Sequence, residues 1–253
     1  MSVSLDTASL IALLLISSRI LAWAVISPPL ATGGVPRLVQ VMLSVAIGLA
    51  LVPGLRAHAP APEIAPVAGA LLEQVLVGAA LGFMTRLVFA AIESAGALID
   101  VFGGFSLSAA YNPLTTTTTS IFGRFYSLLC TTLIFATNAH LLIFQGFLRS
   151  FTAIPLDGHL SMGHLDTVLS GAVTALFIAS LQIAGPLIVV LFVADIALGV
   201  LNRISPQLNA FSISFPLKIG LTLVLIGTGF TLMPNLVVHL AERANDLIAQ
   251  VTG

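Results

Sequence analysis

Residues 202–211 read Asn-Arg-Ile-Ser-Pro-Gln-Leu-Asn-Ala-Phe, and this polar island lies between two long apolar stretches. Residues 167–194 before it carry no Asp, Glu, Lys or Arg, and residues 219–241 after it carry none either. Amides, a guanidinium and a proline between two helices of membrane length indicate a docking surface. The alternative is an ordinary turn, in which Pro206 ends one helix and Asn202 caps it. The local sequence is compatible with both.

The composition predicts a membrane protein. Of the 253 residues, 58% are hydrophobic and 8% are charged, whereas a soluble domain carries about 25% charged residues. The net charge of −1 is unlike the dense basic surface of nucleic-acid-binding proteins, so we expect no nucleic-acid partner. The single cysteine, Cys130, excludes an intrachain disulfide.

Six stretches approach or exceed the length of about 20 apolar residues that a helix needs to cross a membrane. The sequence therefore predicts an all-α polytopic fold with segments at roughly 8–30, 38–55, 67–100, 121–149, 167–201 and 217–240. The first resembles a secretion signal, but no Lys or Arg precedes it, so we expect a retained segment. Positive charges in the connections predict that both termini lie outside the cytoplasm. These charges are Arg37, Arg124, Arg203 and Lys218.

Several charged residues fall inside the apolar segments. Arg19 lies in the middle of the first segment, and Asp195 lies deep in the fifth. Arg86, Glu93 and Asp100 recur every seven residues on the third, which places them on one helical stripe. A charge at mid-bilayer costs about 2.5–3.5 kcal/mol, so we expect these side chains to face protein or water. The alternative for the stripe is an internal Arg86–Glu93 link.

Small residues and a proline mark two further positions in the apolar segments. Gly78 and Gly82 have the GxxxG spacing that lets another helix backbone approach closely. Gly185-Pro186 interrupts the fifth segment. It is compatible with a kink in one helix and with the tip of a hairpin between two shorter helices.

One segment carries no charge and yet is too polar to span a membrane. Its threonine run disfavours helix, and Asn112-Pro113 is a turn signal. Such a segment suits a narrow space lined by protein, and the alternative is an interhelical loop of low complexity. It comprises Phe105, Ser106, Leu107, Ser108, Ala109, Ala110, Tyr111, Asn112, Pro113, Leu114, Thr115, Thr116, Thr117, Thr118, Thr119 and Ser120.

Known catalytic motifs are absent from the sequence. It contains no GxSxG, HExxH, P-loop, paired cysteines or Rossmann glycine pattern. We therefore expect a protein that is not an enzyme and that needs neither a cofactor nor a metal.

The polar island resembles a motif of the FliR family, the membrane component of the flagellar type III protein export gate, which has relatives in virulence secretion systems. Asn202-Arg203-x-x-Pro206-Gln207-x-Asn209 matches the family pattern, and so does Gly96-x-x-Ile99-Asp100-x-x-x-Gly104, which runs into Ala109 and Pro113. Asn112 departs from the Asp that many members carry there. Arg19, Pro28-Pro29, the segment order and the length also agree, so the resemblance covers nearly the whole chain.

The resemblance implies a subunit that assembles with FliP and FliQ into a closed helical cone, through which unfolded flagellar subunits leave the cytoplasm. The implied site is the bacterial inner membrane at the flagellar basal body, with membrane lipid and other export apparatus proteins as further partners. Residues 1–253 then form one membrane domain, in which about 1–200 are FliP-like and an overlapping part from about 167 onward is FliQ-like. Residues 105–120 are expected inside the channel, which they help to block.

Nine residues are expected at subunit contacts if the resemblance holds. These are Arg19, Arg86, Glu93, Asp100, Asn202, Arg203, Pro206, Gln207 and Asn209. One alternative function is the equivalent subunit of a virulence type III system. The other is a secondary transporter for a small solute, which the intramembrane charges and the broken fifth segment favour. The two halves of the chain, however, lack a matching pair of broken segments.

Overall fold

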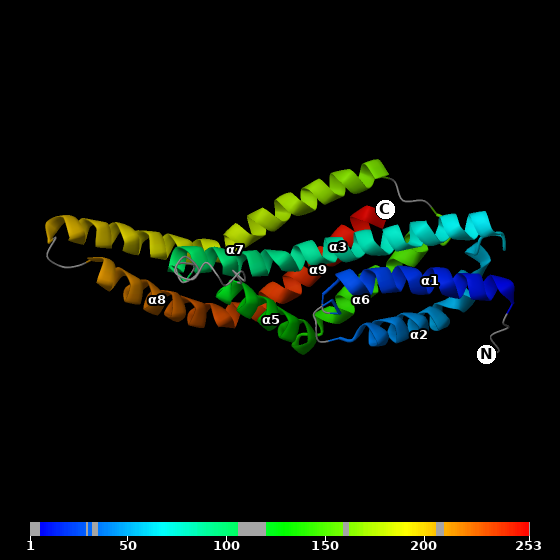
Figure 1. Cartoon of the computed structure of the whole chain (residues 1–253), viewed down its shortest axis with the longest axis horizontal. Helices are drawn as coiled ribbons and strands as arrows, with labels where there is room; N and C mark the ends of the chain where they lie inside the picture. Colours follow the sequence, from blue (N-terminus) through cyan, green and yellow to red (C-terminus); the bar gives the residue numbers. More distant parts are fainter. Residues whose placement is uncertain are drawn as a thin grey trace, which may run out of the picture. The chain divides into compact units, whose positions relative to one another are not determined.

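The computed structural model describes residues 6–28, 30–31, 35–105, 120–158, 162–205 and 210–252 (Figure 1). Within these ranges the secondary structure is helical and no strand occurs, which confirms the all-α prediction. The helices are α1 (Thr7–Ile26), α2 (Arg37–Leu55), η1 (Arg56–His58), α3 (Ile64–Gly103), α5 (Ile121–Ala136), α6 (Ala139–Ala153), α7 (Met162–Ile204), α8 (Ala210–Gly229), η2 (Phe230–Leu232) and α9 (Met233–Thr252).

Five stretches are long and apolar enough to cross a membrane. They are Thr7–Ile26, Arg37–His58, Ile64–Gly103, Leu165–Ile204 and Ser212–Val251. A sixth candidate is the pair α5 and α6, provided that the pair counts as one span. The chain is therefore a membrane protein by length and composition, as the sequence predicts.

The predicted segment at 121–149 is interrupted by a turn at Thr137 and Asn138, and it remains a candidate membrane span if α5 and α6 count together. Helices α5 and α6 are bent by 80° relative to each other. Asn138 at the break has a φ of 59°, a left-handed conformation that Asn tolerates better than most residues. Just before it, the Thr137 hydroxyl donates to the Leu133 carbonyl oxygen at 2.8 Å. A polar pair inside an apolar run thus ends one helix and begins another.

Pro186 does not divide the fifth segment. Helix α7 continues from Met162 to Ile204 with Pro186 inside it. The hairpin alternative is therefore wrong, and the interpretation as a single helix holds. A proline in a helix removes one backbone hydrogen bond and displaces the preceding turn, a defect that long apolar helices tolerate when neighbouring groups satisfy the freed carbonyl.

The chain divides into two compact units. Unit 1 contains residues 1–88, 138–173 and 239–253, and unit 2 contains residues 89–137 and 174–238. In unit 1, Asp6 caps the N-terminus of α1, and its carboxylate accepts from the Ser9 backbone N–H at 2.9 Å. The hydrogen bonds with Ser9 lower the pKa of Asp6 below its ordinary value.

The core of unit 1 forms around one face of α1. Ala12, Leu15, Ile16 and Trp23 are fully buried on that helix. Leu15 and Ile16 follow Ala12 by three and four residues, and Trp23 follows Ile16 by seven, which is the spacing of one helical face. The Trp23 ring stacks on Phe147 of α6 with centroids 4.4 Å apart. It also meets Phe144 edge-on, at 5.1 Å. Aromatic contacts of this kind hold α6 against α1.

Glycines bring the backbones of α1 and α3 together. A Cβ added at Gly78 would overlap the carbonyl oxygen of Arg19, and one at Gly82 would lie 3.0 Å from the carbonyl oxygen of Trp23. The predicted close approach at the GxxxG spacing is confirmed. Its partner is α1 of the same chain.

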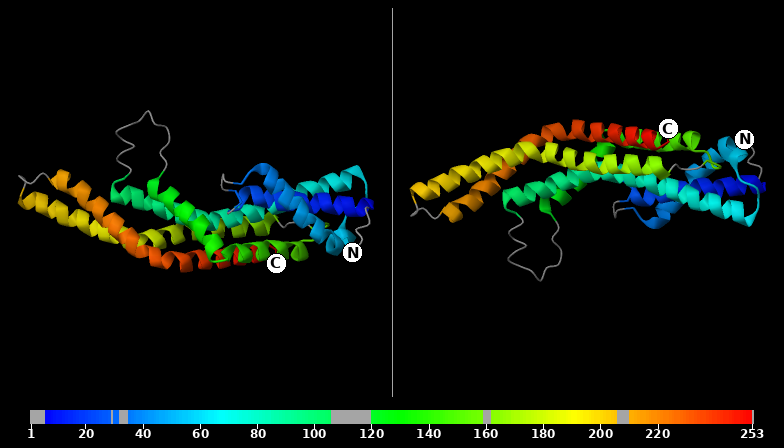
Figure 2. Two further views of the ribbon diagram at one scale, coloured as in Figure 1. Left: turned by 90° about the horizontal axis from the view of Figure 1, so that it is seen from below. Right: turned by 90° about the horizontal axis from the view of Figure 1, so that it is seen from above.

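Unit 2 contains the end of α3, helix α5, most of α7, and α8. Helices α7 and α8 lie side by side as an antiparallel hairpin in all three views (Figures 1 and 2). Helices α3 and α5 also approach closely, because a Cβ at Gly96 would lie 2.5 Å from the Phe122 carbonyl oxygen. The motif glycine at position 96 therefore has a packing role.

Candidate functional site

Arg19 is fully enclosed in unit 1, with 0% of its surface exposed. Its Nε donates to Gln74 Oε1 at 2.6 Å. Its Nη1 donates to the Ser150 carbonyl oxygen at 3.2 Å, and its Nη2 donates to the Ile154 carbonyl oxygen at 2.9 Å. The guanidinium lies 4.4 Å from the centre of the Phe151 ring. The guanidinium thus donates hydrogen bonds to carbonyl oxygens at the C-terminus of α6, where a positive charge is favourable.

The partners of Arg19 thus come from its own chain, on α3 and at the end of α6. This arrangement explains how a guanidinium can lie in the middle of an apolar helix, because each of its three nitrogens donates to an oxygen. Arg19 is a packing residue of unit 1. Its predicted part in subunit contacts stays a prediction.

Asp100 links the end of α3 to the start of α5 in unit 2. Its side chain is buried, at 4% exposure. The carboxylate accepts hydrogen bonds from the Ser120 hydroxyl and from the Phe122 backbone N–H, the latter at 3.2 Å. The Ser120 Oγ accepts in turn from the Gly123 backbone N–H at 2.8 Å. Together the two side chains cap the N-terminus of α5, where a negative charge is favourable.

The end of α3 is closed by a Schellman turn. Gly104 has a φ of 84°, and its N–H donates to the Val101 carbonyl oxygen at 3.4 Å. The Phe105 N–H donates to the Asp100 carbonyl oxygen at 2.9 Å. Glycine is favoured at such a left-handed position because a Cβ there is strained.

Both ends of the predicted channel segment meet at this point. The rings of Phe105 and Phe122 pack edge-to-face with centroids 4.9 Å apart. We call Asp100, Phe105, Ser120 and Phe122 the anchor. Residues 106–119 lie outside the described residues, and the prediction that 105–120 enters a channel stays a prediction.

The predicted stripe on α3 divides into buried and exposed members. Asp100 is buried in the anchor, whereas Arg86 and Glu93 are exposed. Within the described ranges no ion pair joins Arg86 to Glu93, which argues against the internal link. Of the four charged residues of α3, Arg86 and Glu93 therefore face away from the rest of the chain.

The polar island begins inside a helix. Asn202 and Arg203 lie in the last turn of α7 and are exposed. The Ser205 N–H still donates to the Leu201 carbonyl oxygen at 2.9 Å, so Asn202 is a helical residue and the interpretation as its cap is wrong. Pro206, Gln207 and Asn209 lie outside the described residues, and their predicted role stays a prediction.

The structure adds an ion pair that the sequence analysis missed. Lys218 Nζ lies 2.5 Å from Asp195 Oδ1, with 19% and 42% of the respective side chains exposed. Lys218 was expected in a connection but lies inside α8, as Arg37 and Arg124 lie inside α2 and α5. The signal was available, because Asp195 and Lys218 are nearly equidistant from the polar island and an antiparallel hairpin brings such positions together.

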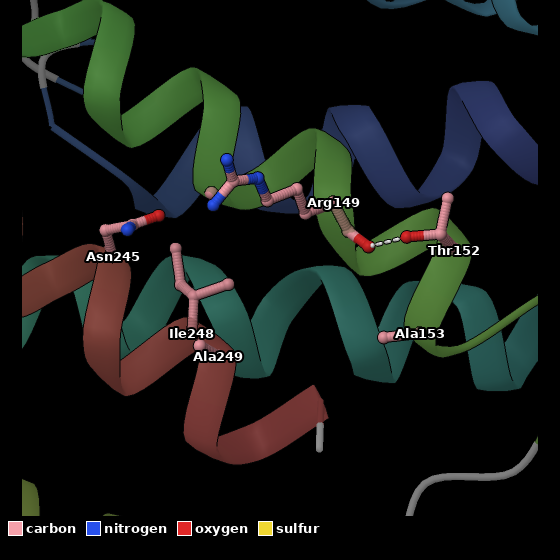
Figure 3. Close-up of a pocket in the computed structure, with 7 residues that line it drawn as sticks. Arg149, Thr152, Ala153, Asn245, Ile248 and Ala249 are labelled. Atoms are coloured by element: carbon pink, nitrogen blue, oxygen red, sulfur yellow. Dashed lines mark hydrogen bonds between the residues drawn. The ribbon is translucent and has the colours of Figure 1, made fainter.

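A small cavity of about 450 Å³ lies between α6 and α9 in unit 1 (Figure 3). Arg149 supplies its ionisable side chain, and the Thr152 hydroxyl donates to the Arg149 carbonyl oxygen at 2.7 Å. The other lining residues are Gly146, Ala153, Asn245, Ile248 and Ala249. Among the residues that the structure describes, no three His, Cys, Asp or Glu side chains are grouped to hold a metal ion. The cavity offers one cation and no acid–base pair.

Comparisons with known proteins agree with the resemblance in the polar island. The flagellar biosynthetic protein FliR of Pectobacterium carotovorum subsp. carotovorum is 31% identical over 235 residues, which cover 92% of this chain and 89% of that protein. FliR of Escherichia coli (strain K12) is 30% identical over 234 residues, with the same coverage. The surface presentation of antigens protein SpaR of Shigella flexneri is 28% identical over 156 residues, which cover 62% of this chain and 60% of that protein. The family model of bacterial export proteins, family 1, matches residues 10–244. The chain therefore belongs to the bacterial export proteins of family 1, and the predicted FliR resemblance is confirmed.

Proposed function

We propose that this membrane protein is a non-enzymatic subunit of the flagellar type III protein export gate, at the bacterial inner membrane in the flagellar basal body. With FliP-like and FliQ-like subunits it forms the channel through which unfolded flagellar subunits leave the cytoplasm. Family membership supports the export role. The structural observation that carries the need for partner subunits is the pair of exposed charges on α3.

Arg86 and Glu93 are exposed on a helix of 40 residues that is otherwise apolar enough to span a membrane. Either charge facing lipid at mid-bilayer would cost about 2.5–3.5 kcal/mol. Seven residues of helix separate them by about 10.5 Å along the axis. A neighbouring helix with an acidic and a basic side chain at that separation neutralises both charges. We therefore propose that Arg86 and Glu93 face another subunit and not lipid.

Glycines of the α7–α8 hairpin support the same proposal. A Cβ added at Gly199, Gly220 or Gly227 would meet no atom within 4 Å, in contrast to the crowded Gly78. Small residues with open space on a membrane helix allow a second helix to approach closely. We propose that this face and the neighbouring Asn202 and Arg203 contact another subunit, together with Pro206, Gln207 and Asn209.

We further propose that residues 105–120 lie in the channel and block it in the resting state. Their charge-free, hydroxyl-rich sequence suits a protein-lined passage. The anchor holds Phe105 and Ser120, the two ends of this segment, close to each other. A segment held at both ends can block a passage without obstructing the rest of the assembly.

The transporter alternative is weakened by the partners of its charged residues. Arg19 is enclosed by oxygens of its own unit, and Asp195 pairs with Lys218. Among the charges that suggested a solute pathway, Glu93 is exposed, whereas the partly exposed Asp195 is neutralised by Lys218. A virulence role is supported by the SpaR relative, but the FliR relatives are more similar and cover more of the chain.

The proposal is tested by isolating the tagged chain from membranes of its own bacterium. We expect FliP-like and FliQ-like proteins to copurify, and Arg86→Gln and Glu93→Gln to reduce their recovery. Glu242→Gln on α9 is the matched control, since Glu242 is also exposed. Recovery of the wild-type chain alone, with a bound small solute, would favour the transporter instead. Normal recovery for both α3 variants would refute the role of the stripe.

A further inference from the structure

Helix α8 reaches the anchor at Thr222. This threonine is fully buried, at 0% exposure. A Cβ added at Gly103 would lie 2.9 Å from Thr222 Oγ1 and 3.1 Å from the Phe105 ring. The space that a side chain at position 103 would occupy is therefore filled by α8 and by the anchor. Gly103 is the last residue of α3, directly before the Schellman turn.

A second contact of α8 lies at the turn itself. A Cβ added at Gly104 would lie 3.6 Å from the Phe215 ring, which is ordinary packing distance. Phe215 and Thr222 are seven residues apart on α8 and so lie on one face of that helix. The same face of α8 thus packs along both glycines that close the end of α3.

Thr222 is also tied to the ion pair of the hairpin. Its hydroxyl donates to the Lys218 carbonyl oxygen at 2.7 Å, one helical turn away. Lys218 in turn pairs with Asp195 of α7. The ion pair and the contact with Gly103 are therefore carried by one short stretch of α8. Because packed interiors do not absorb a shift as large as a methyl group, a movement of this stretch must displace the anchor.

We infer that Gly103 and Thr222 are positioning residues through which the α7–α8 hairpin sets the geometry of the anchor. The Asp195–Lys218 pair fixes the position of α8 against α7. Thr222 on α8 packs against Gly103, so the position of α8 determines where the anchor residues lie. The importance of this coupling for export rests on the proposed function. The coupling itself is a property of the chain and can be measured without export.

Three backbone amides report on the anchor, because their hydrogen bonds hold it together. They are the amides of Phe105, Phe122 and Gly123. Hydrogen exchange is measured on the full chain in lipid nanodiscs. We expect Gly103→Ala to speed exchange at these amides about tenfold, a coupling typical of residues in direct contact. Adding Thr222→Ala removes the clashing hydroxyl and should restore protection. Gly171→Ala, where a Cβ meets no atom within 4 Å, is the control.

The role of the ion pair is tested with Lys218→Met, which keeps the helix but removes the charge. We expect faster exchange at the same three amides, and recovery when the pair is reversed as Asp195→Lys with Lys218→Asp. The inference is wrong if Thr222→Ala does not rescue Gly103→Ala. It is also wrong if Lys218→Met changes exchange only within α7 and α8. A chain that fails to copurify with export subunits but shows the expected exchange would overturn the proposed function and leave the coupling intact.

Discussion

The carboxylate of Asp100 and the hydroxyl of Ser120 are hydrogen-bonded to each other across 20 positions of the sequence. The bond joins the last turns of α3 to the N-terminus of α5, and it encloses the segment that we place in the channel. Its two members also satisfy the first free N–H groups of α5. One pair of side chains thus serves helix capping and the closure of a long connection.

Replacement of Asp100 by Ala should lower the thermal stability of the purified chain. Loss of an N-cap costs about 0.5–2 kcal/mol, and the buried Phe122 N–H that loses its acceptor adds to that cost. Asp100→Asn keeps an acceptor oxygen and should be milder. Glu93→Ala should leave the unfolding of the isolated chain unchanged and reduce only assembly. Equal melting temperatures for Asp100→Ala and wild type would contradict the capping role.

Replacement of Arg19 by Met should destabilise unit 1 strongly. The change leaves Gln74 Oε1 and the Ile154 carbonyl oxygen without the donors they have in Arg19, whereas the Ser150 carbonyl oxygen keeps the Ile154 N–H. Each buried acceptor without a partner costs about 1–3 kcal/mol. The exposed Arg56 is the control, and Arg56→Met should unfold at the wild-type temperature. Thermal unfolding in detergent distinguishes the two, and similar curves would show that the buried guanidinium contributes little.

Substitution by alanine should have opposite effects on stability at crowded glycines, such as Gly78, and at glycines with open space beside them, such as Gly220. Gly78→Ala places a methyl group on the Arg19 carbonyl oxygen and should destabilise the isolated chain, because backbone must move. Gly220→Ala meets open space and should stabilise its helix by up to about 1 kcal/mol. Recovery of partner subunits should fall for Gly220→Ala if that face is an interface. Unchanged recovery would remove Gly220 from the proposed contact.

Arg203→Ala should weaken copurification of partner subunits more than Arg243→Ala. Both side chains are exposed, but Arg203 lies at the polar island whereas Arg243 lies near the end of α9. Arginine offers a planar fork of donors that can bind amides or backbone oxygens of a neighbouring subunit. Wild-type recovery for both variants would contradict a role of the island in assembly.

Deletion of residues 112–117 should make membranes permeable to small ions while the assembly still forms. The deletion leaves the anchor intact, so a defect is attributed to the segment itself. Ion conductance is measured in cells, and copurification in parallel confirms that the complex is present. A correctly assembled deletion variant with normal permeability would show that the segment does not block the channel.

Hydropathy alone predicts most of the helices. A segment in a membrane must pair its own backbone N–H and C=O groups, which favours a helix, and its side chains must be apolar where they face lipid. The same signal hides the break at Asn138, since two polar residues barely change the average over an apolar run. Arg19 is conspicuous in the sequence, but its acceptors lie 55 to 135 residues away, where no local pattern points to them. The sequence predicts a contact between Asp195 and Lys218 only if the two apolar helices around the polar island are paired as an antiparallel hairpin.

The oxygens that hold the Arg19 guanidinium have a consequence for sequence divergence. Two of the three belong to the main chain, at positions 150 and 154, and only the one from Gln74 belongs to a side chain. The hydroxyl of Ser150 is buried and makes no hydrogen bond within the described part of the chain. Position 150 can therefore exchange Ser for Ala without loss of the bond that its carbonyl accepts. For the hydrogen bonds of the guanidinium, the side-chain identities that matter are therefore those of Arg19 and Gln74.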